Sequence, residues 1–346
     1  MSQRPIAYLM EQTLGSITHY LNLRREENAA DGVPPRWLPI EFQRTRAPWA
    51  VTGSLRARRA LSPMLGEVDG VFMHTTTIAL LAGDIFRKKP TVLSSDGTPF
   101  NKRNMRLDYG LGAQGLLAEK AKRSVYRYVF RRAAGFVAWS NWTKASLVED
   151  YGCRDEDVAV IPPGIQLDDF APGDRAHPLP RILFVGGDFV RKGGDLLLDV
   201  FRKRLRGRAE LVLVTRGVVD EEPGVSVHRD VTANSAKLRD LYATSDVFAL
   251  PTRADCYSVA CMEAMAAALP VVATNVGGIP DIVREDETGF VIRPDDGGAL
   301  GDVLELLVTD APKRLAMGRA SRDHAFARFE ARANARHLFE FVRSRC

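Results

Sequence analysis

The chain has 346 residues, of which 45% are hydrophobic, 8% aromatic and 26% charged. This length suits two domains of ordinary size, and the balanced composition excludes a disordered, fibrous or collagenous protein. The four cysteines show no zinc-type spacing, the first residues offer only a short apolar stretch, and no run has the length of a membrane span. We therefore expect a reduced, cytoplasmic protein, with any membrane contact peripheral, on the inner face of the membrane.

Charge is divided unevenly along the chain, whose formal net charge is +5. Residues 1–135 carry 21 Lys and Arg against 11 Asp and Glu, a net +10, whereas residues 136–346 carry 27 against 32, a net −5. The excess suggests an anionic partner for the front half: a nucleic acid, a phosphorylated substrate or an anionic membrane surface. A solvated surface that is merely rich in Arg is the alternative.

Short apolar runs alternate with helical patterns, which predicts parallel sheets in an α/β fold. Prolines and glycines punctuate residues 162–180, where we place a linker between domains at 1–170 and 171–328. Residues 329–346 form an amphipathic helix that either ends the second domain or crosses back to the first. The predicted strands are residues 6–10, 70–73, 91–94, 135–138, 158–161, 181–185, 210–214, 225–228, 247–250, 271–273 and 289–292.

Two features of the front half invite a functional interpretation. Gly110, Gly112 and Gly115 match the G-x-G-x-x-G spacing, but no apolar strand precedes them, so we expect a loop rather than a dinucleotide site. Residues 102–132 combine cations with apolar residues at helical spacing, which favours either binding to an anionic membrane or packing on the first sheet. No recognition module accompanies the charge, so nucleic acid is not expected. The cations that share one face of this helix are Lys120, Arg123, Arg127 and Arg131.

In the back half, residues 182–194 predict a strand that runs into a glycine-bearing loop and then a helix. Backbone N–H groups and the helix dipole would face an anion there. Arg191 and Lys192 add the positive charge that a diphosphate requires. An ordinary loop with two solvated cations explains the same residues equally well.

A second group of residues follows the strand that ends at Leu250. Ser258 lies near the start of the next helix, Asp255 precedes it in the loop, and Glu263 falls in the second helical turn. Both carboxylates are expected to point at the crevice beyond the strand ends. By itself, a single acidic residue before a helix usually does no more than interact favourably with the helix dipole.

Together these segments resemble the nucleotide-sugar domain of retaining glycosyltransferases of family 4, which have the GT-B fold of two facing Rossmann-like domains with a deep interdomain cleft. The resemblance is strong from about Val160 to about Leu307 and weaker in the front half. The segments that carry it are residues 160–165 with Phe170, 184–186 with 192–193, the two acids Asp255 and Glu263, and residues 263–266, 270–274 and 277–278.

The resemblance implies transfer of a sugar from a nucleotide diphosphate donor to a hydroxyl of a saccharide or lipid acceptor. It implies retention of configuration and a front-face mechanism. Since the sequence shows no cluster of metal ligands, we also expect no metal or other cofactor. Lys192, helped by Arg191, would hold the donor diphosphate, Glu263 the ribose hydroxyls and Asp255 the sugar hydroxyls. The other residues assigned to the donor site are Gly15, Gly186, Gly187, Arg216 in the loop expected near the base, Tyr257, Ser258 and Val259.

Three positions depart from the family pattern. Gly187 stands where the family usually has Arg, Asp255 replaces a Glu, and Asp96 stands where many relatives carry a His near the reacting centre. Residues 12–18 resemble the Gly-rich first loop of the family, and His74 ends a strand expected to face the cleft. The acceptor-side residues are therefore His74, Asp96 and Ser16, and the catalytic ones Lys192, Asp255, Glu263 and Asp96.

Two other interpretations fit the same scaffold. One is a sugar-nucleotide epimerase or hydrolase with the GT-B fold. The other is a non-catalytic nucleotide-sugar-binding protein, in which Gly187 and Asp96 would mark lost chemistry.

Overall fold

A computed structural model describes residues 3–13, 15–30, 32–44, 46–105, 107–110, 112 and 115–346. The chain divides into two compact units, each described below by itself. The first comprises Met1–Asn104, Gly112–Gly164 and Ala331–Cys346, and the second comprises Met105–Leu111 and Ile165–Glu330.

The division between the units follows Gly164, whereas the sequence placed the end of the first domain at 170. The reason is the short 3-10 helix Leu167–Phe170, whose Phe170 is buried in the second unit. Its ring lies 5.5 Å from that of Tyr242, edge to face. Aromatic pairs of this geometry are stabilising, so this ring contact holds the segment on the second unit.

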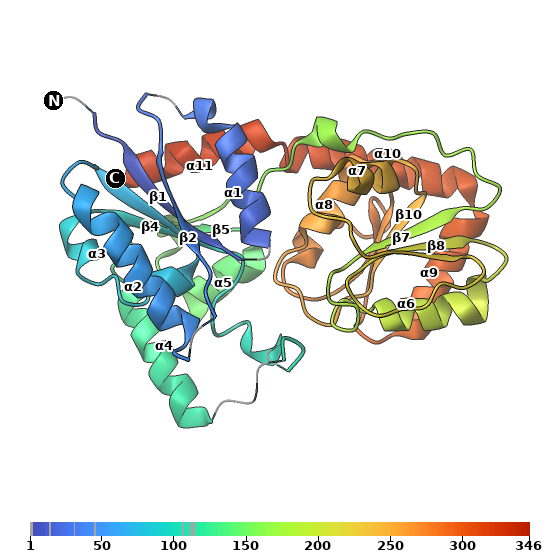
Figure 1. Cartoon of the computed structure of the whole chain (residues 1–346), viewed down its shortest axis with the longest axis horizontal. Helices are drawn as coiled ribbons and strands as arrows, with labels where there is room; N and C mark the ends of the chain where they lie inside the picture. Colours follow the sequence, from blue (N-terminus) through green and yellow to red (C-terminus); the bar gives the residue numbers. More distant parts are fainter. Residues whose placement is uncertain are drawn as a thin grey trace. The chain divides into compact units, whose positions relative to one another are not determined.

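The first unit is built on a six-stranded sheet in which every pairing is parallel (Figure 1). The strand order is β2-β1-β3-β4-β5-β6, which places the change of direction between β1 and β3. The carboxyl ends of these two strands are where ligands bind in open α/β sheets. The strands are β1 (Ile6–Gln12), β2 (Arg36–Glu41), β3 (Gly70–His74), β4 (Thr91–Ser95), β5 (Gly135–Ala138) and β6 (Val158–Val160).

Among the described residues of this unit, β2 is the one strand that the sequence analysis missed. It lies at the edge of the sheet and contains Pro39, and its residues are mostly exposed or half-buried. A proline is tolerated at an edge because its missing N–H has no partner to lose there. The same proline and the absence of a continuous apolar run hide the strand in the sequence.

The side chains of β1 alternate between two cores, one on each face of the first sheet. Ala7 and Leu9 join a core that includes residues of α2, α4 and α5, whereas Ile6, Tyr8 and Met10 join a core that includes residues of α1 and α11 (Figure 1). Burial of both faces is what produces the continuous apolar run in the sequence. The helices of this unit are α1 (Gly15–Arg25), α2 (Trp49–Leu61), α3 (Ile85–Lys88), α4 (Leu116–Phe130), α5 (Asn141–Glu149) and α11 (Ala331–Arg345).

The second unit also has an all-parallel six-stranded sheet, in the order β12-β11-β10-β7-β8-β9. This is the doubly wound Rossmann order, with its switch point between β7 and β10. The predicted α/β class and parallel sheets are thus confirmed. The elements are β7 (Arg181–Val185), β8 (Glu210–Val214), β9 (Val225–His228), β10 (Val247–Leu250), β11 (Val271–Thr274), β12 (Gly289–Ile292), α6 (Gly194–Val200), α7 (Ala236–Ala243), α8 (Val259–Ala266), α9 (Gly297–Thr309) and α10 (Ala311–Arg328).

Candidate functional site

Two loops meet at the switch point of the second unit. One follows β7 and the other follows β10. Gly193, at the start of α6, has φ of +76°, and a Cβ placed on it would lie 1.9 Å from the carbonyl oxygen of Pro251. Only glycine satisfies both constraints, because L side chains disfavour that φ and no other residue leaves room for the carbonyl. This close approach brings the glycine-bearing loop against the loop that carries Asp255.

The cations of the first loop are held by groups of the second. Lys192 forms an ion pair with Asp255, and both side chains are largely buried. Arg191 donates through Nη1 to the carbonyl of Ala254 at 2.7 Å and pairs with Asp188 at 3.3 Å. The guanidinium of Arg191 also lies 4.7 Å from the centre of the Tyr109 ring. Residues 63 positions apart in the chain are thereby joined at one edge of the sheet.

Glu263 lies in α8 with only 5% of its surface exposed. Its Oε2 accepts a hydrogen bond from the Tyr242 hydroxyl at 3.0 Å. Burial raises the pKa of Glu263 to about 7, and the Tyr242 hydrogen bond opposes that rise. A carboxyl that titrates near neutrality in a buried position is the kind of group that functional sites contain.

The buried thiol of Cys261, in the first turn of α8, is within electrostatic reach of three of the predicted residues. Burial raises its pKa to about 12, and the charges of Asp255, Lys192 and Glu263 act on it as well. Lys192 and Asp255 are in direct contact, and Glu263 lies two residues after Cys261 on the helix that follows the Asp255 loop. The structure thus pairs the lysine with one of the two acids that the sequence singled out and places the other acid in the adjoining helix.

The start of α8 lies beside this cluster. Ser258 caps the helix, its hydroxyl accepting from the Cys261 N–H at 3.4 Å, and Val259 is the first helical residue. Ser258 and Tyr257 are both buried. Backbone N–H groups at the start of a helix carry partial positive charge, which suits an anionic ligand.

Gly186 and Gly187 follow β7, and Arg216 follows the neighbouring strand β8. Gly186 donates its N–H to the carbonyl of Val214 at 2.9 Å, so the two strand ends run side by side. The Arg216 side chain is exposed at this edge. The predicted donor-site residues of the second unit therefore all belong to the loops and the helix start at the carboxyl ends of β7, β8 and β10, or to the first turns of α8.

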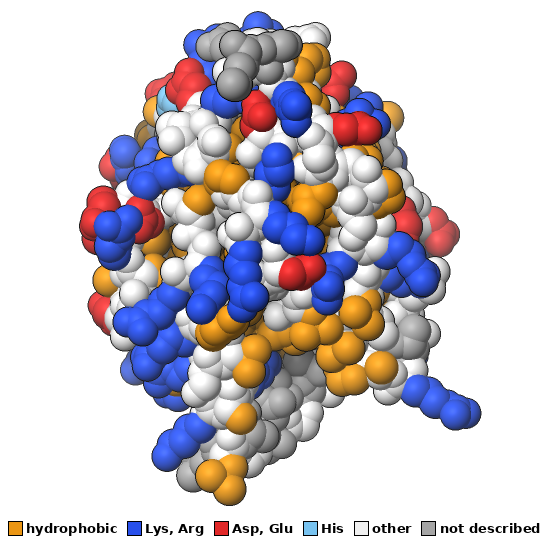
Figure 2. Space-filling view, turned by 90° about the vertical axis from the view of Figure 1, so that its left-hand side faces the viewer, with side chains coloured by type: hydrophobic (Ala, Val, Ile, Leu, Met, Phe, Trp, Pro, Cys, Tyr) orange, Lys and Arg blue, Asp and Glu red, His pale blue; other side chains and the backbone are white. Residues whose placement is uncertain are grey.

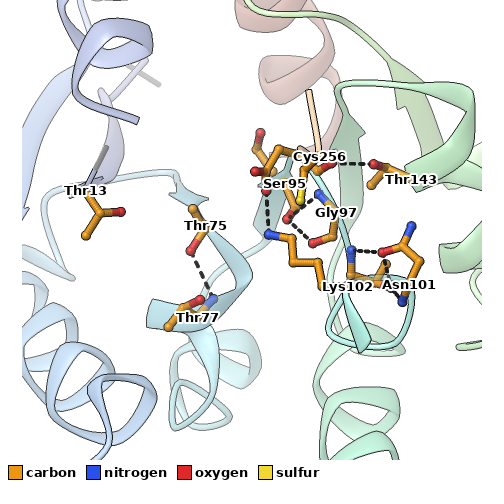
Figure 3. A network of polar contacts seen from close by, with 12 residues as sticks. Thr13, Thr75, Thr77, Ser95, Gly97, Asn101, Lys102, Thr143 and Cys256 are labelled. Carbon is orange, nitrogen blue, oxygen red and sulfur yellow. Dashed lines mark hydrogen bonds and ion pairs between the residues drawn. The ribbon is translucent and has the colours of Figure 1, made fainter. Parts of the chain in front are cut away.

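The switch point of the first unit carries a buried carboxylate that the sequence analysis did not single out. Glu11, in β1, is 5% exposed and accepts from Trp49 Nε1 at 2.8 Å and from the hydroxyls of Thr13, at 3.1 Å, and Thr75. Figure 3 shows Thr13 and Thr75 projecting from neighbouring strand ends. The signal in the sequence that could have revealed Glu11 is its position as an acidic residue directly after the apolar run of residues 6–10.

Asp96 directly follows β4 in the first unit. Lys102 Nζ donates to its Oδ1 at 2.7 Å, and its backbone carbonyl accepts from the Thr143 hydroxyl at 2.8 Å (Figure 3). Both charged side chains remain about one third exposed. The position where the family resemblance suggests a His is therefore occupied by a carboxylate paired with a lysine, and the catalytic role of Asp96 stays a prediction.

His74 ends β3 and is only 1% exposed. Its Nδ1 lies 3.2 Å from the Ser94 hydroxyl, and its ring stacks on that of Trp139 and lies 4.9 Å from that of His19. Burial lowers the pKa of His74 to about 3, with a smaller effect from the charge of Lys102. The imidazole is thus neutral at physiological pH. Its assignment to the acceptor stays a prediction.

Gly15 and Ser16 begin α1. A Cβ placed on Gly15 would meet no atom within 4 Å, and Ser16 donates its N–H to the carbonyl of Thr13 at 2.9 Å. The glycine is thus exposed at the turn between β1 and α1, beside the Glu11 cluster in sequence. Leu14, in the middle of the predicted Gly-rich loop, lies outside the described residues.

Helix α4 carries an exposed apolar stripe with cations beside it. Leu117 is 83% exposed, and Val125 and Tyr128 are each 46% exposed. Lys120 and Arg131 are exposed as well. Figure 2 shows Lys and Arg side chains mixed with hydrophobic ones on this side of the molecule. The apolar residues that pack on the first sheet, Tyr126, Val129 and Phe130, are different ones.

Two of the four cations that share one face of this helix are bound by the chain itself. Arg123 donates to the carbonyl of Asp150 at 2.9 Å and pairs with its carboxylate at 3.3 Å, and Arg127 donates to the same carbonyl at 2.8 Å. These two cations attach α4 to the end of α5. Arg106, part of the basic segment in sequence, lies outside the described residues.

Within the described ranges, no three His, Cys, Asp or Glu side chains are grouped as metal ligands. In the same ranges, no helix is long and apolar enough to cross a membrane.

Solved structures establish the fold to which these units belong. Sucrose-phosphate synthase of Thermosynechococcus elongatus superimposes with a TM-score of 0.78 at 16% identity, covering 99% of each chain. Anabaena HepE in complex with UDP and glucose superimposes with a TM-score of 0.71 at 16% identity, covering 99% of this chain and 100% of the other. The predicted GT-B fold, with two Rossmann-like units, is confirmed.

Sequence comparison then identifies the family. Residues 179–310 match the family model of Glycosyl transferases group 1, and residues 18–169 match that of Glycosyltransferase Family 4. The chain belongs to glycosyltransferase family 4.

Two curated relatives illustrate the range of the family around this chain. D-inositol 3-phosphate glycosyltransferase of Nocardia farcinica is 28% identical over 241 residues, which are 62% of this chain and 53% of that protein. GDP-mannose-dependent alpha-(1-6)-phosphatidylinositol monomannoside mannosyltransferase of Mycobacterium tuberculosis is 29% identical over 233 residues, 59% of this chain and 60% of that protein. The matches thus span between about half and three fifths of these relatives.

Proposed function

We propose that this protein transfers a sugar from a nucleotide diphosphate sugar to an acceptor hydroxyl, with retention of configuration. The observation that carries the proposal is the buried Lys192–Asp255 ion pair, which joins the loops after β7 and β10 at the switch point of the second unit, with the buried Glu263 in the helix that follows. Family membership adds the class of reaction. The alternatives are an epimerase or hydrolase on the same scaffold and a non-catalytic nucleotide-sugar-binding protein, in which Asp96, at the place where the family resemblance suggests a His, would mark lost chemistry.

The proposed roles follow from the chemistry of each group. Lys192 and the start of α8 place positive charge where the departing diphosphate becomes more negative, which is the expected source of much of the rate enhancement. Glu263, when ionised, accepts from two ribose hydroxyls, and Asp255 accepts from sugar hydroxyls. The proposed front-face reaction uses no carboxylate nucleophile and no metal, so added chelator should leave transfer unchanged.

For the donor and acceptor, the named relatives suggest where to look first. One is described as GDP-mannose-dependent and acting on a phosphatidylinositol monomannoside, and another as acting on D-inositol 3-phosphate. We propose an acceptor of the saccharide or lipid-linked class and include inositol phosphates among the compounds to be tested.

A thermal-shift screen with uridine, guanosine and adenosine diphosphates and their sugars tests the donor site. A ligand at a hundred times its dissociation constant stabilises the folded state by about 2.7 kcal/mol, which gives a measurable rise in melting temperature. We expect one nucleotide series to raise it. If none does, the proposed donor site is wrong.

The nucleotide sugar that raises the melting temperature is then incubated with the protein, with and without acceptors. Transfer that needs an acceptor and keeps the anomeric configuration is expected. Isomerised sugar or free sugar formed from the donor alone would favour the epimerase or hydrolase, and binding without any turnover would favour a non-catalytic protein.

We further propose that α4 brings the first unit to an anionic membrane surface. An apolar stripe flanked by cations suits the interface between head groups and acyl chains, and each cation near an anionic surface contributes about 1 kcal/mol. Among the described residues, the stripe of Leu117, Val125 and Tyr128 is exposed and is not part of the core under α4. A helix that faced only solvent on this side would not need apolar side chains there. The localisation proposed is therefore peripheral.

Vesicle sedimentation tests the membrane contact. We expect the protein to bind vesicles of phosphatidylcholine with phosphatidylglycerol, less well at high salt, and to bind phosphatidylcholine alone poorly. Leu117→Ser with Tyr128→Ser, and separately Lys120→Glu with Arg131→Glu, should each weaken binding at least about tenfold. Arg336→Glu, an exposed charge reversal on α11 over the opposite face of the sheet, is the control. Equal binding by all four proteins would leave the basic face without a membrane role.

A further inference from the structure

The cations at the carboxyl edge of the second sheet differ in what they already bind. Lys192 is paired with Asp255, and Arg191 with Asp188 and the carbonyl of Ala254. Arg253 nearby is paired with Asp195 at 2.7 Å and with Asp295. Among the described residues, by contrast, the Arg216 guanidinium forms no ion pair and donates no hydrogen bond. Of these cations, Arg216 is the one whose donors are all available for a ligand.

The position of this guanidinium is set by the pairing of two strands. Val185, at the end of β7, is in register with Val214, at the end of β8. The residues that follow, Gly187 and Arg216, therefore come side by side, with the Arg216 N–H 3.4 Å from the Gly187 carbonyl oxygen. A Cβ placed on Gly187 would lie 3.0 Å from Arg216 Nη2 and 3.2 Å from its Nε. The Arg216 head group thus lies where a side chain at residue 187 would begin.

We infer that Arg216 is the arginine that binds the donor diphosphate in this protein. Its side chain starts after the end of β8. Its guanidinium lies where a side chain on residue 187, in the glycine-bearing loop after β7, would begin. A guanidinium has five donors in a planar fork and binds phosphate oxygens in pairs, which the single ammonium of Lys192 does not do. This inference rests on the proposed function and changes the role of Arg216 from a neighbour of the base to a ligand of the phosphates.

Binding of nucleosides and of nucleoside diphosphates separates the two roles. The probes are a nucleoside and its diphosphate, with the base that the thermal-shift screen selects, and their binding is measured by calorimetry. We expect Arg216→Ala to weaken diphosphate binding about 10- to 100-fold, because hydrogen bonds to a charged group contribute that much to the binding free energy. Nucleoside binding should stay unchanged. If Arg216 contacted the base instead, the variant would bind the nucleoside and the diphosphate equally less well, and that result would overturn the inference.

A transplanted arginine gives the sharper test. In Arg216→Ala combined with Gly187→Arg, a side chain that begins where the Arg216 head group lay returns a guanidinium to the same loop, so we expect most of the lost diphosphate affinity to be restored. Arg216→Lys should restore only part of it, because an ammonium lacks the planar fork. A double variant as weak as Arg216→Ala would contradict the proposed position of the phosphate-binding cation.

Two controls keep this inference apart from the proposed function itself. Arg208→Ala removes an exposed arginine just before the opposite end of β8, where it pairs with Glu305, and should leave nucleotide binding unchanged. Lys192→Ala should weaken diphosphate binding whatever Arg216 does. If Lys192→Ala has this effect and Arg216→Ala does not, the donor site stands and the role assigned to Arg216 falls. If neither variant affects binding, the donor site itself is wrong.

Discussion

Glu263→Gln is expected to lower kcat/KM for the nucleotide-sugar donor by at least about 10²-fold above neutral pH, because two hydrogen bonds to a charged acceptor contribute about 1.5–3 kcal/mol each. The effect should shrink as the pH falls. Below about pH 7 the buried Glu263 of the unaltered protein is itself protonated, since burial raises its pKa to that value. The acidic limb of the kcat/KM profile near pH 7 should therefore be absent from the variant.

Tyr242→Phe provides an independent check on the origin of that limb. The Tyr242 hydroxyl donates to Glu263 and lowers its pKa, so removing it should move the acidic limb to higher pH. Tyr151→Phe is the matched control, because Tyr151 is a buried tyrosine of the first unit that is hydrogen-bonded to Thr98 instead. A limb that stays in place in Tyr242→Phe, or persists in Glu263→Gln, would show that another group titrates.

Lys192→Ala is expected to lower kcat by about 10²–10³-fold, the usual effect of removing one preorganised donor to developing negative charge. It should also lower the melting temperature. Asp255 is 8% exposed, and without Lys192 its carboxylate is left buried and unpaired, which typically costs about 3–5 kcal/mol.

The two consequences of this substitution can be separated. Lys192→Ala combined with Asp255→Asn removes the unpaired charge, so the melting temperature should recover while kcat does not. Lys203→Ala, which removes an exposed lysine paired with Asp199 in the same unit, should change neither. Recovery of turnover in the double variant would mean that Lys192 acts only through stability.

The fold was accessible from the sequence because its strands are buried on both faces. Strands such as β7 and β10 appear as continuous apolar runs bounded by glycine and proline. Strand β2 was not accessible, since a half-exposed edge strand needs no such run and tolerates Pro39. The candidate acids Asp255 and Glu263 were found through their motif, whereas Glu11 belongs to no motif and was missed.

The sequence by itself determined the α/β class, nearly every strand, the family resemblance and the residues at the carboxyl ends of β7 and β10. These properties depend on local periodicity and on motifs within a few turns of chain. Only the tertiary structure decided which charges meet: Arg123 with Asp150, Lys102 with Asp96, and Arg216 beside Gly187. Such pairs depend on strand register and helix packing between distant segments. The charge of a residue is therefore visible in the sequence, whereas its partner, or its lack of one, is not.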